Sequence, residues 1–101
     1  MKYTVEHFIK KFSAIDDWNW LTGMFSNYEL SRHCALGHCR NNFIDYNGRI
    51  VSESTPESTA LVGLLPDIVL INDRPFFEKY SQETPKARVL AALNDLKKAQ
   101  G

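Results

Sequence analysis

Residues 31–42, SRHCALGHCRNN, form the segment best supplied with side chains that can do chemistry. This segment holds both cysteines of the chain and two of its three histidines. Thiolates and imidazoles are common zinc ligands, and a thiol beside a histidine is the pairing that thiol-dependent enzymes use. The segment therefore has three interpretations, namely a metal site, a nucleophile, or a packed part of the core.

The spacing of Cys34 and His38 gives the nucleophile interpretation its physical content. If Ser31 caps a short helix that runs to residue 42, Cys34 lies in the first turn, where unpaired N–H groups stabilise a thiolate. His38 follows one turn later and lies within reach as a base. No oxyanion-forming motif and no third orienting group can be identified from the spacing. A thiol-dependent enzyme centred on Cys34 and His38 is therefore the alternative interpretation.

A metal-binding protein centred on Cys34 and His38 is the other form of this alternative. A zinc site needs four converging ligands, and this helix aims only Cys34 and His38 at one point. Further ligands such as His7, His33 or Asp73 would have to come from other segments, and no second cluster has metal-ligand spacing. We therefore expect no metal and no cofactor.

Cys39 points elsewhere on the same predicted helix. It lies about 140° from Cys34, on the side that carries Leu36 and Phe43, which predicts a small buried thiol in the core. Five helical residues also hold the two cysteine Cα atoms beyond the roughly 7 Å that a disulfide tolerates. Both thiols are therefore expected to be free, as is usual in a reducing compartment.

Three helices are predicted from capping residues that precede apolar stripes. Thr4 precedes the first stripe, and the pairs Thr55-Pro56 and Thr84-Pro85 place a proline at the first helical position, where its missing N–H is not needed. The apolar run 68–71 follows Asp67 and fits a strand or one or two helical turns, of which we favour the helix. Asn47-Gly48 marks a turn.

These elements predict one domain over residues 1–101. We expect an all-α or mainly α fold of four to five short helices with long ordered loops. The predicted core is Phe8, Ile9, Phe12, Leu36, Cys39, Leu61, Leu64, Leu65, Val89, Leu90 and Leu93.

Charge and hydropathy exclude several classes of partner. The chain has 12 Lys and Arg against 12 Asp and Glu, so no positive field attracts phosphate groups, and nucleic acid is not an expected partner. No apolar run approaches the roughly 20 residues that span a bilayer, and the first residues lack the apolar stretch of a secretion signal. We therefore expect a cytoplasmic protein without a membrane partner.

Aromatic and polar side chains outside the cysteine segment add candidate contacts. Trp18 and Trp20 stand two residues apart in an irregular segment, so one is expected to face inward while the other stays exposed as a partner anchor. The same choice between an inward and an exposed position applies near the other end of the chain to Phe76, Phe77 and Tyr80.

Asn72 and Asp73 end the apolar run 68–71. Short polar side chains at such a position usually end one element and bond the backbone of the next loop. A ligand contact is the other interpretation of this pair.

The order of motifs resembles a family of small uncharacterised bacterial and phage proteins. The motifs are Trp18, Thr22-Gly23, Cys34–Cys39, Ile71–Asp73 and Thr84–Leu93, and they are specific only in combination. The resemblance implies a compact, mainly helical domain of unknown function whose motif segments meet at one place. It supplies no reaction.

Together these observations favour a non-enzymatic binding or accessory module of phage or mobile-element origin. The expected binding surface lies between the Trp18 loop, the Cys34/His38 face and the Asn72-Asp73 turn, with Trp20 beside it. The expected occupant is a protein partner or a second copy of the chain in a homodimer.

Overall fold

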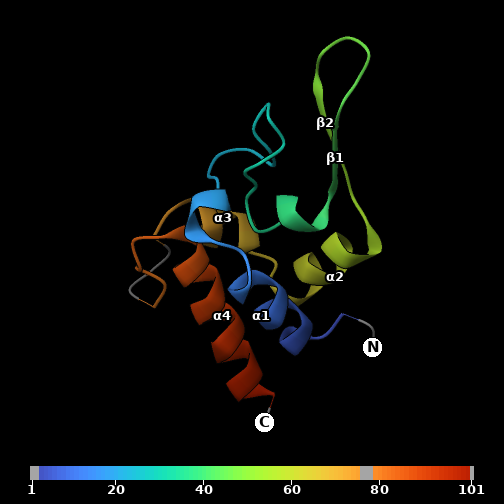
Figure 1. The fold of residues 1–101 in the computed structure, drawn as a ribbon. Coiled ribbons are helices and arrows are strands. Elements are labelled where there is room, and N and C mark those ends of the chain that lie inside the picture. Colours follow the sequence, from blue (N-terminus) through green and yellow to red (C-terminus); the bar gives the residue numbers. More distant parts are fainter. Residues whose placement is uncertain (1–2, 76–78, 101) are drawn as a thin grey trace.

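The fold combines helices with a small sheet (Figure 1). The structure is a computed structural model that describes residues 3–75 and 79–100. Within these residues the α-helices and β-strands, in chain order, are α1 (Val5–Ser13), β1 (Asn41–Ile44), β2 (Ile50–Glu53), α2 (Pro56–Leu64), α3 (Ile68–Asp73) and α4 (Pro85–Ala99). The expectation of an all-α fold is therefore wrong, because the chain is mixed α/β.

The three predicted caps are confirmed by their hydrogen bonds. The hydroxyl of Thr4 accepts from the backbone N–H of His7 at 3.2 Å, and that of Thr84 accepts from Ala87 at 3.2 Å. Thr55 accepts from the N–H of Ser58 at 3.0 Å, while the Ser58 hydroxyl accepts from the N–H of Thr55 at 2.8 Å, which forms a reciprocal capping box. These bonds satisfy donors that a helix start leaves unpaired, so local sequence sets where α1, α2 and α4 begin.

The core lies where α4 packs against α1 and α3 (Figure 1). Seven predicted core residues are buried, namely Phe8, Phe12, Leu36, Cys39, Leu61, Val89 and Leu93. The other four only pack against its edge, namely Ile9, Leu64, Leu65 and Leu90. Trp20, Ile68 and Ile71 also belong to the core. The 68–71 run is helical, as favoured from the sequence.

The predicted helix over residues 32–42 is wrong. Only Gly37–Cys39 form a short 3₁₀ turn, and β1 begins at residue 41 and pairs with β2 in antiparallel register, with Phe43 opposite Val51. The expected turn at Asn47-Gly48 is present, but it joins two strands instead of separating a helix from coil. Apolar residues that flank an Asn-Gly pair, among them Ile44 and Ile50, are a hairpin signal that outweighs the weak helical spacing.

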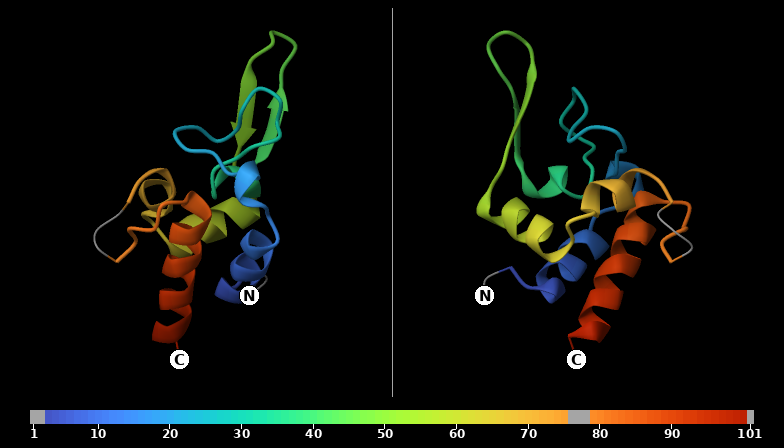
Figure 2. Two further views of the ribbon diagram at one scale, coloured as in Figure 1. Left: turned by 60° about the vertical axis from the view of Figure 1, so that its left-hand side comes forward. Right: turned by 180° about the vertical axis from the view of Figure 1, so that it is seen from behind.

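The hairpin turn is a three-residue loop closed at its tip. The N–H of Gly48 donates to the carbonyl of Asp45 at 3.0 Å, and the N–H of Asp45 donates to the carbonyl of Arg49 at 2.9 Å. Gly48 has φ +78°, the left-handed conformation that this loop needs and that glycine adopts without steric cost. The hairpin projects well clear of the helices in all three ribbon views (Figures 1 and 2).

The long loop between α1 and the 3₁₀ turn is ordered by its own hydrogen bonds. The N–H of His33 donates to the carbonyl of Asn19 at 3.0 Å, and the carbonyl of His33 accepts from Leu21 at 2.9 Å. The side-chain oxygen of Asn27 accepts from the N–H groups of Ser31 and Arg32. Ser31 therefore closes a turn and caps no helix.

Within the described part of the chain, no helix has the length and apolar content that crossing a bilayer requires. Phe76 and Phe77 lie outside the described residues. The hydroxyl of Tyr80 donates a hydrogen bond to Asp95 of α4 at 3.1 Å, which holds the ring against this helix.

Candidate functional site

A cavity of about 130 Å³ lies where the loop after Trp20 meets α3. Its lining comes from three segments far apart in the sequence and comprises Gly23, Met24, Phe25, Cys34, Val69 and Asp73. The Trp18 loop, Cys34 and the Asn72-Asp73 turn thus each contribute lining residues to this cavity. Trp18, Trp20, His38 and Asn72 do not line it.

Cys34 forms the inner wall of this cavity as a neutral thiol. Its side chain is buried, and its Sγ accepts a hydrogen bond from the N–H of Gly37 at 3.2 Å. Burial raises the pKa of Cys34 above its ordinary value, and the nearby negative charge of Asp73 raises it further. The first-turn effect that would have stabilised a thiolate is absent because no helix starts at Ser31.

His38 has surroundings of its own. Its ring packs edge-to-face on Trp20, with centroids 5.0 Å apart, and on His33 at 5.1 Å. Burial, followed by the charge of His33, lowers the pKa of His38 to about 4, so the ring is neutral at pH 7. Among the described residues the Nε2 atom of His38 has no hydrogen-bond partner. Cys34 and His38 therefore do not form the thiol–base pair that the alternative function requires.

We expect both thiols to react slowly with iodoacetamide in the native protein near neutral pH. Burial raises the pKa of Cys39 to about 12 and also raises that of Cys34, and alkylation follows the thiolate fraction. Mass spectrometry over time should show modification at least about a hundredfold slower than in urea. Fast and selective modification of Cys34, absent in Cys34→Ser, would restore the nucleophile interpretation.

Stability should fall as the pH drops below the ordinary histidine pKa. Because the folded-state pKa of His38 is lowered to about 4, the unfolded chain binds a proton first as pH falls through about 6.5. The loss in the free energy of unfolding should approach about 3 kcal/mol near pH 4. The charged or titratable groups that act on His38 are His33 and Lys11. Urea unfolding across this pH range checks it. His38→Gln should flatten the dependence, and an unchanged slope would assign it to other groups.

Asn72 joins three segments and is completely buried. Its Oδ1 accepts from the N–H of Ala35 at 2.9 Å, and its Nδ2 donates to the carbonyl of Leu21 at 2.9 Å. Asp73, the last residue of α3, accepts through Oδ1 from the N–H of Gly23 at 3.1 Å. The pair ends an element as predicted, but it bonds the earlier loop and not the one that follows. Asn72 is thus structural, and only Asp73 reaches the cavity.

The buried Arg88 of α4 supports this junction, and sequence reasoning missed it. Its guanidinium donates to the carbonyls of Ile71 and Asn72, at 2.8 Å and 2.7 Å, where α3 ends. It also donates to the carbonyl of Gln82 at 2.7 Å. Carbonyls at a helix C-terminus lack partners within the helix, and a cation there also suits the macrodipole. Helical spacing alone cannot show that Arg88 turns inward.

The two tryptophans divide as expected, with one inward and one exposed. Trp20 is buried, packs edge-to-face on Phe12 and donates from Nε1 to the carbonyl of Ile15 at 3.3 Å. Trp18 is 75% exposed, and the guanidinium of Arg32 lies 5.0 Å from its ring centroid. Only Trp18 is available as a contact.

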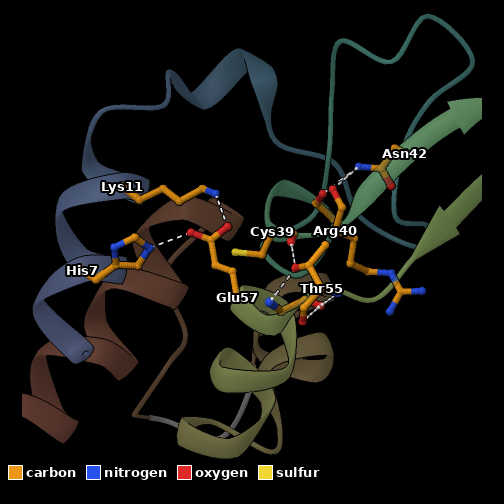
Figure 3. Close-up of polar contacts among 9 residues, drawn as sticks. His7, Lys11, Cys39, Arg40, Asn42, Thr55 and Glu57 are labelled. Carbon is orange, nitrogen blue, oxygen red and sulfur yellow. Dashed lines mark hydrogen bonds and ion pairs between the residues drawn. The ribbon is translucent and has the colours of Figure 1, made fainter. Parts of the chain in front are cut away.

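A second polar cluster joins α1 to α2 (Figure 3). Glu57 accepts from Lys11 at 2.6 Å and lies 2.6 Å from the Nε2 atom of His7. Burial raises the pKa of Glu57, but its hydrogen bonds with Lys11 and His7 outweigh this and hold the pKa below its ordinary value. The buried Cys39 lies alongside, and its carbonyl accepts from the Thr55 hydroxyl. The helical spacing of His7 and Lys11 was visible in the sequence, but the shared carboxylate was not.

Metal binding has no geometric basis in the described part of the chain. There, no three His, Cys, Asp or Glu side chains are placed to hold one ion. His7, Glu57 and Cys39 lie in one cluster, yet they do not converge as ligands.

No family model, curated protein or solved structure matches this chain. The resemblance to a family of small bacterial and phage proteins therefore stays an expectation.

Proposed function

We propose that the protein is a non-enzymatic binding module that holds an apolar side chain of a protein partner in the cavity beside Met24 and Val69. The observation that carries the proposal is the exposure of apolar side chains around the opening. Met24 is 52% exposed, Val69 42% and Phe25 36%. Exposed apolar residues around a preformed hollow are typical of interaction sites, where one anchor side chain fills the pocket.

The size and lining of the cavity suit such an anchor. A cavity of about 150 Å³ in another protein accommodates benzene, and this cavity of about 130 Å³ is close to that size. Asp73 contributes a carboxylate to the lining, but its Oδ1 is held by Gly23 and Asn72, so it shapes the wall. Burial of one apolar side chain contributes about 1.5–3 kcal/mol, which is typical of a central contact in a protein interface.

The same geometry gives the thiol-enzyme alternative little support. A nucleophile in this cavity would have to be Cys34, whose pKa is raised and which has no hydrogen bond to His38. The proposal predicts that Cys34→Ser keeps both the fold and the affinity for the partner, whereas a thiol enzyme would lose its activity.

The first test uses benzene and indole as probes of the cavity. Methyl NMR spectra should show saturable shifts at Met24 and Val69, with smaller shifts at the Val62 methyls. Val62 is a suitable reference because it is 40% exposed and lines a different hollow on α2, beside Leu36 and Thr59, so its shifts show whether the probes prefer the first cavity. Shifts that spread evenly over exposed methyls would contradict a specific cavity.

The second test asks whether a protein uses the same surface. A partner captured by the wild-type chain should bind Met24→Asp at least tenfold more weakly, because a charge would be buried at the anchor. The matched control Val62→Asp should bind it as the wild type does. A partner that binds all three chains equally would contradict the proposed surface.

A further inference from the structure

The exposed hairpin offers one open strand edge, which goes beyond the proposed function and does not depend on it. In an antiparallel pair, alternate residues direct their N–H and C=O groups away from the partner strand. The bond from Asp45 to Arg49 sets this alternation, so Ile44 and Asn42 direct theirs outward from β1. Ile50 and Ser52 direct theirs outward from β2.

The two strand edges differ in whether their outward backbone groups already have hydrogen-bond partners. The guanidinium of Arg40 donates to the outward carbonyl of Ser52 at 2.6 Å and to its hydroxyl at 2.9 Å, while stacking 4.4 Å from the ring of Phe25. A charged side chain on an edge blocks further pairing. Among the described residues, nothing bonds the outward backbone groups of Asn42 or Ile44. β1 is therefore the open edge.

Several large apolar side chains of the hairpin are exposed to solvent. Phe43 is 36% exposed, Ile44 40% and Tyr46 97%. A two-stranded sheet that projects from the body is only marginally stable in water, and additional strands stabilise it. Nothing in the described chain supplies a third strand beside β1 (Figures 1 and 2).

We propose that β1 pairs with β1 of a second copy of this chain, which makes a four-stranded antiparallel sheet across a two-fold axis. The sequence of β1 complements itself in one register. With Phe43 on the axis, Asn42 of each copy lies opposite Ile44 of the other, so every outward backbone group of both residues is paired. Phe43 then meets its symmetry mate at a closely spaced pair, where aromatic contacts stabilise a sheet.

The charges of the hairpin permit this pairing with a like chain. In this register Asp45 faces Asn41 of the other copy, so no two carboxylates lie opposite each other. Asp45 already accepts from the N–H groups of Asn47 and Arg49, which holds its charge at the turn. The edge therefore carries no charge that would select an acidic or basic foreign peptide. The small area of contact predicts a dimer that dissociates on dilution.

The test is sedimentation velocity over a dilution series, with circular dichroism as the check on folding. The wild type should shift from dimer to monomer on dilution. Ile44→Pro should be monomeric throughout, because it removes an outward N–H that the hairpin does not use and blocks the edge. The matched control Ile50→Pro makes the same change on β2 and should still dimerise.

Each outcome bears on the proposal. If Ile50→Pro loses the dimer and Ile44→Pro keeps it, pairing occurs through β2 and the proposal is wrong. A wild type that stays monomeric up to NMR concentrations would also contradict the proposal. Phe43→Cys tests the register independently. In the proposed dimer residue 43 of one copy lies directly opposite residue 43 of the other, close enough for a disulfide. On mild oxidation Phe43→Cys should form a linked dimer, while Val51→Cys, on the same face of β2, should not.

Discussion

Replacing Gly37 by alanine should destabilise the protein by about 3 kcal/mol or more. A Cβ at this position would lie 1.9 Å from the carbonyl oxygen of Phe25 and 2.8 Å from its carbonyl carbon. Both are backbone atoms, so no side-chain rotation relieves the overlap, and the loop must move away from the 3₁₀ turn. Urea unfolding followed by tryptophan fluorescence measures the loss.

Gly63→Ala is the matched control, with an expected effect of opposite sign. Gly63 lies in α2, and no atom lies within 4 Å of the position that its Cβ would take. Alanine at a helical position stabilises by roughly 0.5–1 kcal/mol relative to glycine, so this variant should unfold at higher urea. Equal stability of Gly37→Ala and the wild type would show that the loop is not packed against Gly37.

Replacing Asn72 by alanine should cost about 3 kcal/mol. The change leaves the buried N–H of Ala35 and the half-buried carbonyl of Leu21 without their partner inside the protein, and an unpaired buried group costs about 1–3 kcal/mol. It also opens a small void beside Arg88, whose guanidinium bonds the Asn72 carbonyl. Thermal and urea unfolding should agree on the loss.

Asn94→Ala provides the comparison for Asn72. Asn94 is exposed on α4 and makes a single side-chain bond, to the carbonyl of Leu90 at 2.9 Å. Its removal should change the free energy of unfolding by no more than about 0.5 kcal/mol, because water replaces the lost partner. A comparable loss in the two variants would mean that Asn72 is hydrated and does not join segments.

Both large effects concern the walls of the same cavity. Gly37 sets how closely Phe25 approaches the cysteine segment, and Asn72 connects Leu21 with Ala35. Each substitution should therefore weaken the benzene-induced shift at Met24 as well as stability. The binding surface is thus expected to depend on close backbone approach and on a buried amide rather than on a reactive side chain.

The starts of the major helices were readable from local sequence. Threonine followed by a good first turn satisfies backbone donors within three residues, so Thr4, Thr55 and Thr84 specify α1, α2 and α4 without help from distant residues. The apolar patterns then identify seven of the fourteen buried apolar residues that the structure describes, and the separation of Trp18 from Trp20 follows from their spacing. Both free thiols were likewise expected, and both cysteines are free.

The fold class and the site depended on interactions that no local pattern encodes. Spacing favoured a helix through Cys34 and His38, but residues 41 and 42 pair with β2, and the N–H of Ala35 donates to the distant Asn72 side chain instead of a helical carbonyl. The cavity forms only when Gly23, Cys34 and Asp73 are brought together over some fifty residues, with the Asn72 amide between them. Local propensity can set where helices begin, whereas burial and long-range hydrogen bonds, which exist only in the folded chain, set which side chains meet.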